Sequence, residues 1–289
     1  MRHPLEATRG RGPRASRAWN PLLCLGPGDV VVVLLAHPDD ESFFTGGTLA
    51  LLSDAGVTTV LVMATLGELG RPNDPALRGE LDGQATMAPV RRDELRRACE
   101  VLGIAHQPLL GGAGRWTDSG HPARGGGRDR LVANVDAAAR DLLALLVALR
   151  PQVLVSFDAR GCTGHPDHIA CHRMAMAAAR ALSRAGSDLH GMALIADGNG
   201  GAPPSGGPAA GPVLALDVTR HRARKLRAVS CHRSQVGRAV RDLSALDAFD
   251  PASAITRYLP GIVRHGPGPH VERYTWLPAT RLAAATGDA

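Results

Sequence analysis

Two short motifs in the chain each place histidine beside carboxylate groups. The first is Ala36-His37-Pro38-Asp39-Asp40-Glu41, and the second is Gly164-His165-Pro166-Asp167-His168. A single His-Pro-Asp sequence is usually a turn, because proline and aspartate both favour turns, but two copies favour a shared site. Catalytic zinc takes three nitrogen or oxygen ligands and leaves a fourth position for water. The pKa of that water falls to about 7, so these residue types indicate metal-assisted hydrolysis at neutral pH.

Each motif follows an apolar run that should form a strand buried on both faces. The runs are Val30 to Leu35 and Val153 to Phe157. Pro38 cannot donate to a strand ladder or lie inside a helix, so it should end the first strand. The histidines and aspartates then follow the carboxyl ends of parallel strands, which is the edge where open α/β sheets bind their ligands.

The rest of the chain alternates between strand and helix patterns, which predicts an α/β fold. We expect a Rossmann-like, mostly parallel sheet flanked by helices, with a smaller C-terminal strand-and-helix extension. Further strands are expected where aliphatic and β-branched residues cluster, at 58–64, 107–110, 192–196 and 213–218. Helices are expected at 48–55, 90–102, 131–149, 167–183 and 219–232. Glycine-rich loops at 67–89 and 111–130 are long enough to cover the site.

The composition of the chain indicates how it is divided into domains and which classes of partner it can bind. The chain has 289 residues with 3% aromatics and a net charge of +6, of which residues 1–20 hold +4. We expect a disordered basic tail over residues 1–28, a single domain over 29–282 and a frayed C-terminus over 283–289. Few aromatic residues are present to stack on nucleic-acid bases. No apolar run reaches the roughly 18 residues of a membrane span. The five cysteines form no C-x-x-C pair. We therefore expect a cytoplasmic protein with no nucleic-acid or membrane partner.

The two motifs resemble those of the LmbE-like, or PIG-L, zinc-dependent N-deacetylases, which remove acetyl groups from N-acetylglucosaminyl compounds. Segments similar to other parts of that family follow in order at 65–70, 91–95, 110–120 and 225–235. The resemblance covers about residues 30–236 and is most specific in the paired motifs. Segment 110–120 is most similar to the branch of the family that acts in mycothiol synthesis on N-acetylglucosaminyl-inositol.

The resemblance implies a metal centre with His37, Asp40 and His168 as ligands. It also implies that Asp39 is the general base, because this residue adjoins a ligand and can reach the metal-bound water. The ion would be Zn²⁺, with Fe²⁺ as the alternative, since histidine and aspartate accept both.

The resemblance assigns further roles around the substrate. His165 would be a protonated donor that stabilises the oxyanion and releases the amine, oriented by Asp167; a scaffold role is the alternative. Arg91 and Asp118 match family positions that hold the sugar and its aglycone, as donor and acceptor to hydroxyl groups. His232, in the late segment, would support the site loops.

Three more positions bear on the substrate region. Glu68 follows a strand and is either a site carboxylate or a loop anchor. Arg71 stands where the mycothiol-branch enzyme carries a glutamate, and Thr163 stands where it carries a tyrosine that aids the oxyanion. These differences predict an altered aglycone pocket around an intact metal centre.

The expected activity is therefore hydrolytic. The protein should be a zinc-dependent hydrolase that removes the N-acetyl group from a GlcNAc-type amino-sugar glycoside, a small-molecule natural-product or mycothiol precursor. The alternatives are an amidase that acts on mycothiol S-conjugates and a non-catalytic sugar-binding protein of the same fold. Nothing in the sequence indicates the oligomeric state.

Overall fold

A six-stranded sheet lies at the centre of the molecule, in the order β2-β1-β3-β4-β6-β5. The computed structural model describes residues 20–72, 77, 79, 87–120, 127–196, 211–236 and 270–284. The strands are β1 (Val30–Leu35), β2 (Thr58–Met63), β3 (Val153–Phe157), β4 (Gly191–Ile195), β5 (Val213–Asp217) and β6 (Val271–Pro278). The first four pair in parallel, and β6 is antiparallel to both of its neighbours. The predicted Rossmann-like, mostly parallel sheet is confirmed.

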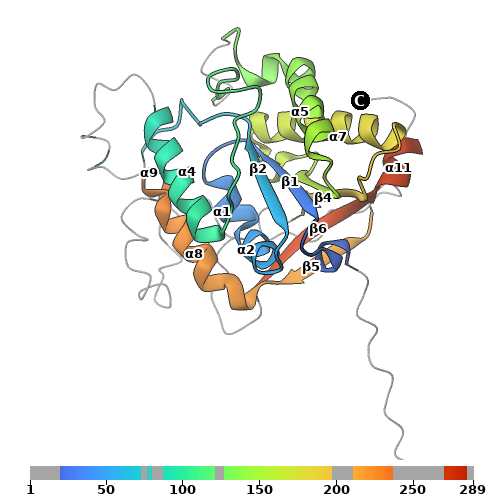
Figure 1. Ribbon diagram of the computed structural model, residues 1–289. Coiled ribbons are helices and arrows are strands. Elements are labelled where there is room, and N and C mark those ends of the chain that lie inside the picture. Colours follow the sequence, from blue (N-terminus) through green and yellow to red (C-terminus); the bar gives the residue numbers. More distant parts are fainter. Residues whose placement is uncertain are drawn as a thin grey trace, which may run out of the picture.

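Helices cover both faces of this sheet (Figure 1). The α-helices are α1 (Asp40–Phe44), α2 (Gly46–Asp54), α4 (Ala88–Leu102), α5 (Val135–Leu149), α6 (Gly161–Gly164), α7 (Pro166–Arg184), α8 (Arg222–Cys231), α9 (Arg233–Val236) and α11 (Ala279–Ala284). Three 3₁₀ turns are η1 (Pro21–Cys24), η3 (Leu131–Ala133) and η4 (Thr219–His221). α5, α7 and α11 pack together, and α2, α4 and α8 form a second group. No helix within these described ranges is long and apolar enough to cross a membrane.

β1 and β3 are adjacent at the middle of the sheet, and this adjacency brings the two motifs together. Their parallel register pairs Val31 with Val153 and Val33 with Val155. All residues of β3, and all of β1 except Val30, are buried. Helices on both faces explain why these strands read as continuous apolar runs. The turns that follow β1 and β3 therefore leave the same edge of the sheet.

Several boundaries differ from those predicted. The predicted helix 131–149 is divided into η3 and α5, and the predicted helix 219–232 begins as η4 and ends at Cys231. Segment 107–110 forms only isolated bridges to β2, from His106 and Leu109. Of the predicted tail, residues 20–28 are described and bury Leu22, whereas residues 1–19 lie outside the described residues.

β6 was not predicted as a strand, and it inserts between β4 and β5. Its Glu272 is buried and accepts hydrogen bonds from the backbone N–H groups of Gly47 (2.9 Å) and Thr48 (2.8 Å). These N–H groups begin α2, so Glu272 caps a helix about 225 positions earlier in the chain. Lys225 of α8 completes the arrangement, with its Nζ 2.7 Å from the Glu272 carboxylate.

Candidate active site

The first motif forms a tight turn between β1 and α1. Asp39 has φ 123° and ψ −32°, a backbone conformation that costs a non-glycine residue about 1–3 kcal/mol. Hydrogen bonds hold the turn: the His37 N–H donates to Asp40 Oδ2 (2.8 Å), and the Asp39 N–H donates to Glu41 Oε2 (3.0 Å). The turn directs Asp39 and Asp40 to the carboxyl edge of the sheet.

The second motif begins α7, and its hydrogen bonds assign the tautomers of two histidines. His165 caps the helix, with its Nδ1 accepting from the Asp167 N–H at 3.2 Å, so the ring proton is on Nε2. His168 Nδ1 lies 3.0 Å from the Gly161 carbonyl oxygen and donates to it, which leaves the lone pair of Nε2 free. The His168 ring also stacks on Phe157 at 4.0 Å, which fixes its plane.

The two turns bring the three predicted metal ligands together. His168 Nε2 lies 3.3 Å from Asp40 Oδ1, and His37 Nδ1 lies 3.7 Å from Asp40 Oδ2. All three side chains are buried. The free lone pair of His168 and the shared carboxylate suit one divalent cation.

Two groups of side chains around His37 have their ligand atoms within 4.8 Å of one another, and neither group includes Asp40. One joins His37 with His165 and His168, and the other joins His37 with Asp118, His165 and Asp167. In the second group, His37 Nε2 lies 3.1 Å from Asp167 Oδ2. This contact leaves Nδ1, the nitrogen that faces Asp40, as the ligand atom of His37, and it favours the predicted triad.

The charges of these groups also fit a cation. Burial acts to lower the pKa of His37, but hydrogen bonds to Asp118 and Asp167 outweigh it and hold the pKa well above the usual value of 6.5. Burial acts to raise the pKa of Asp40, but the charge of His168 outweighs it and lowers the pKa. The proton on His37 thus offsets part of the charge of the surrounding carboxylates, and a divalent cation would offset the same charge.

Asp39 has the properties of a base that works near neutral pH. Burial raises its pKa to about 7, against the lowering effect of Arg91, whose Nη2 is 3.1 Å from Asp39 Oδ2. Arg91 is itself buried and donates to the carbonyl oxygens of Pro38 and Gly67. Arg91 was expected to hold substrate, and the contacts that the structure shows for it are with Asp39 and the surrounding turn. A bound cation would lower the pKa of Asp39 further.

His165 and Asp167 are placed differently from the expectation. The Asp167 carboxylate, predicted to orient His165, has its Oδ2 on His37 Nε2 and on the Ser119 N–H (3.0 Å). Its other oxygen has no hydrogen-bond partner among the described residues. Burial and the charges of His37 and His168 lower the pKa of His165 to about 4. This lowered pKa favours a neutral His165 with its proton on Nε2, whereas the expectation was a protonated ring.

The loops beyond β2 contribute the other predicted residues. Asp118 Oδ1 lies 3.7 Å from His37 Nε2, at the rim of the histidine cluster. Glu68 accepts from the backbone N–H groups of Asp118 (2.8 Å) and Leu66 (3.1 Å), which favours the loop-anchor role. Arg71 is exposed near the end of the described range 20–72, and no described contact brings it to the cluster.

One pair of site residues was not foreseen as a pair. Glu41 lies inside the first motif but was assigned no role, and His232 was expected only to support the loops. Their side chains are fully buried, and His232 Nε2 is 2.6 Å from Glu41 Oε1. The glutamate in the motif and the histidine in the late segment were visible in the sequence, but nothing local indicated that they meet.

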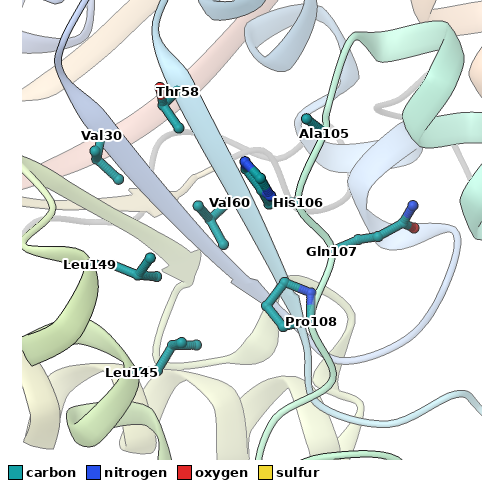
Figure 2. Close-up of a pocket in the computed structure, with 9 residues that line it drawn as sticks. All are labelled: Val30, Thr58, Val60, Ala105, His106, Gln107, Pro108, Leu145 and Leu149. Carbon is teal, nitrogen blue, oxygen red and sulfur yellow. The ribbon is translucent and has the colours of Figure 1, made fainter.

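A second feature, an apolar cavity of about 500 Å³, lies at the opposite end of β1 and β2 (Figure 2). Residues of the two strand starts, of α5 and of segment 105–108 line it, including Val30, Thr58, Val60, Leu145 and Leu149. His106 is the one titratable residue of its lining. Its described lining therefore holds no cluster of titratable groups like the one at the carboxyl edge.

Comparison with known proteins identifies the family. The PIG-L family, described as GlcNAc-PI de-N-acetylase, matches residues 32–179. A 1D-myo-inositol 2-acetamido-2-deoxy-alpha-D-glucopyranoside deacetylase of Actinosynnema mirum is 37% identical over 233 residues, 71% of this chain and 80% of the relative.

Two solved structures have the same fold. The A40926 pseudoaglycone deacetylase Dbv21 has a TM-score of 0.58 at 20% identity and covers 86% of this chain and 96% of its own. The N,N'-diacetylchitobiose deacetylase of Pyrococcus horikoshii has a TM-score of 0.54 at 23% identity, and the match covers 87% of this chain and 85% of that protein. At such identities the likeness shows the fold alone, whereas the family match, which spans both motifs, and the 37% identical relative show that the chain belongs to the PIG-L family.

Proposed function

We propose that this protein is a metal-dependent N-deacetylase that hydrolyses the acetamide of a GlcNAc-type glycoside. The observation that carries the proposal is the meeting of His37, Asp40 and His168 beside Asp39 at the carboxyl edge of the sheet. Membership of the PIG-L family supports the reaction class. A sugar-binding protein without catalysis would have no need for a carboxyl on a strained turn next to a cation site.

His37, Asp40 and His168 would hold the cation, and we propose Zn²⁺ because the set is two imidazoles and one carboxylate. When bound, the cation would polarise the acetamide carbonyl and increase the acidity of a nearby water. Asp167 orients the His37 ring by accepting from its Nε2, as carboxylates commonly do behind metal-binding histidines.

The remaining steps belong to Asp39 and His165. Asp39 accepts a proton as the water oxygen bonds to the acetamide carbon, and it returns this proton to the nitrogen as the C–N bond breaks, releasing acetate and the amine. A carboxyl whose pKa is about 7 before the cation binds suits both transfers. His165 donates its Nε2–H to the oxyanion that forms on the carbonyl oxygen.

For the substrate, we propose N-acetylglucosaminyl-inositol or a related glycoside. The Actinosynnema relative is named for that inositol glycoside. Asp118 would accept from a sugar hydroxyl at the rim of the cluster, as the resemblance implied. Arg71 remains the residue that we expect to distinguish aglycones, since its charge is opposite to the glutamate expected there.

The test is acetate release by the full-length protein. The zinc-loaded protein, a chelator-treated sample and a sample reloaded with zinc are compared on N-acetylglucosaminyl-inositol, a panel of other N-acetylated amino-sugar glycosides and a mycothiol S-conjugate. We expect metal-dependent release from at least one glycoside, and a loss of at least about 10³-fold in Asp39→Asn, because general base catalysis alone is worth about 10²–10⁴. An Asp39→Asn protein with full activity would remove Asp39 from the mechanism, and zinc-loaded wild type that releases no acetate from the panel would refute the proposal.

A further inference from the structure

The strained turn at Asp39 requires an explanation, because a non-glycine residue at φ 123° persists only when its neighbours hold it. The Asp39 N–H donates to Glu41 Oε2 at 3.0 Å. The position of this acceptor depends on what holds the rest of the Glu41 carboxylate. Glu41 is completely buried, so bulk water cannot take that role.

Two donors hold the other oxygen of Glu41. Ser42 Oγ donates to Oε1 at 2.6 Å, and His232 Nε2 lies 2.6 Å from the same atom. His232 is also completely buried and sits where α8 ends and α9 begins. It therefore ties the turn after β1 to a helix junction 191 positions later in the chain.

Glu41 connects His232 to the backbone of Asp39. The His232 Nε2–H, the Glu41 carboxylate and the Asp39 N–H form one hydrogen-bonded series. The carboxylate accepts at both ends, so a shift of Oε1 moves Oε2 and with it the Asp39 backbone. Arg91 contacts the Asp39 carboxylate and the Pro38 carbonyl oxygen, so it holds the turn from a second side and does not touch the Asp39 N–H.

We propose that His232 is a positioning residue that fixes the general base Asp39 through Glu41. This inference rests on the proposed function. His232 does not touch the reacting atoms, and a role limited to filling space in the core is the alternative that the experiment must separate.

The chain allows a matched pair of variants at this position. In His232→Gln the side-chain amide nitrogen can occupy the place of Nε2 and still donate to Glu41. In His232→Asn the amide nitrogen corresponds to Nδ1 and does not reach Glu41. Both replacements are neutral and polar, so a difference between them reports the hydrogen bond. Thermal unfolding checks that each variant is folded, and elemental analysis checks that each binds the same amount of zinc.

Two readouts are compared. The first is hydrogen exchange of the Asp39 amide, followed by NMR in labelled protein, and the second is steady-state turnover. We expect His232→Asn to lose protection at Asp39 and about 100-fold in kcat, with KM within about twofold, because misplacement of a catalytic group by about 1 Å costs about that much. His232→Gln should keep the protection and most of kcat. Equal protection and equal kcat in the two variants would show that His232 only packs, and would overturn the proposal.

The exchange measurement separates this inference from the proposed function. If wild type releases no acetate, the proposed function fails. Hydrogen exchange of the Asp39 amide then decides by itself whether His232 holds the turn. If His232→Asn does not fold, wild-type protein labelled at histidine decides: a slowly exchanging His232 Nε2–H supports the hydrogen bond to Glu41, and a rapidly exchanging one overturns it.

Discussion

Lys225→Met should destabilise the protein strongly, although the side chain lies outside the metal centre. Lys225 Nζ and Glu272 Oε1 are 2.7 Å apart, and their side chains are only 3% and 4% exposed. Removing one partner of a buried ion pair costs about 3–5 kcal/mol, because the other charge stays buried. Glu272 would keep its bonds from Gly47 and Thr48 at the start of α2, so we expect the lower figure, about 3 kcal/mol.

Thermal unfolding of the zinc-loaded protein measures this effect. At about 2 °C per kcal/mol for a chain of this size, the midpoint should fall by about 6 °C. The control is Glu100→Gln, which breaks an exposed pair with Arg96 and should move the midpoint by less than about 1 °C. The double variant Lys225→Met with Glu272→Gln should recover most of the loss, because it leaves no unpaired charge. A single variant as stable as wild type, or a double variant less stable than the single one, would refute this reasoning.

The loss of stability in Lys225→Met should depend on pH. Burial acts to raise the pKa of Glu272, but Lys225 outweighs it, and the pKa lies below its ordinary value of 4.5. The pair therefore stabilises wild type fully above about pH 4.5, and this stabilisation is lost as the pH falls through the lowered pKa. Without Lys225 the pKa should rise, so the difference in unfolding free energy between variant and wild type should grow from pH 4 to pH 7. A difference that is constant over this range would contradict the assignment.

Three further predictions concern the metal centre. Zinc binding at pH 7 should release at least about one proton per ion, because coordination displaces the proton that His37 holds in the metal-free site. Calorimetry in buffers of different ionisation enthalpy measures the number of protons released. A release near zero would contradict the assignment of His37 as a ligand. Asp167→Asn should weaken zinc binding about 10–100-fold in a competition assay, because it weakens the hydrogen bond that orients His37; unchanged affinity would remove that role. Gly67→Ala should lower kcat about 10–100-fold, because a Cβ there would lie 1.9 Å from Arg91 Nη1 and displace the partner of the base. Gly186→Ala, with a similar positive φ and open space around it, should lose some stability but no activity, and equal losses of activity in the two variants would rule out the effect on Arg91.

The central strands and both motifs could be predicted because their signals are local. A valine-rich run that ends at Pro38 identifies a buried strand and its end without knowledge of any partner. The same holds for α4, whose end at Gly103 is visible as a glycine and appears in the structure as a left-handed residue with φ 80°. The meeting of the motifs followed from the topology of parallel sheets rather than from the residues themselves.

β6 escaped prediction because its apolar pattern is interrupted by charge. Glu272 and Arg273 fall within the strand, and Glu272 is buried only because Lys225 and the start of α2 satisfy it. Such a residue looks exposed until its distant partner is known. The direction of the Asp167 carboxylate was missed for a similar reason: the sequence shows that it follows His165, but only the packing shows that it faces His37.

The place of β6 in the sheet has a consequence for synthesis of the chain. β5 pairs with β6 alone among the described strands, and 53 residues separate the end of β5 from the start of β6. At about 5–20 residues per second, the ribosome needs roughly 3–11 s to bridge that gap. During this interval β4 and β5 present unpaired backbone, which is a template for contact with other nascent chains. The protein is therefore most exposed to aggregation, and most in need of a chaperone, just before its last strand emerges.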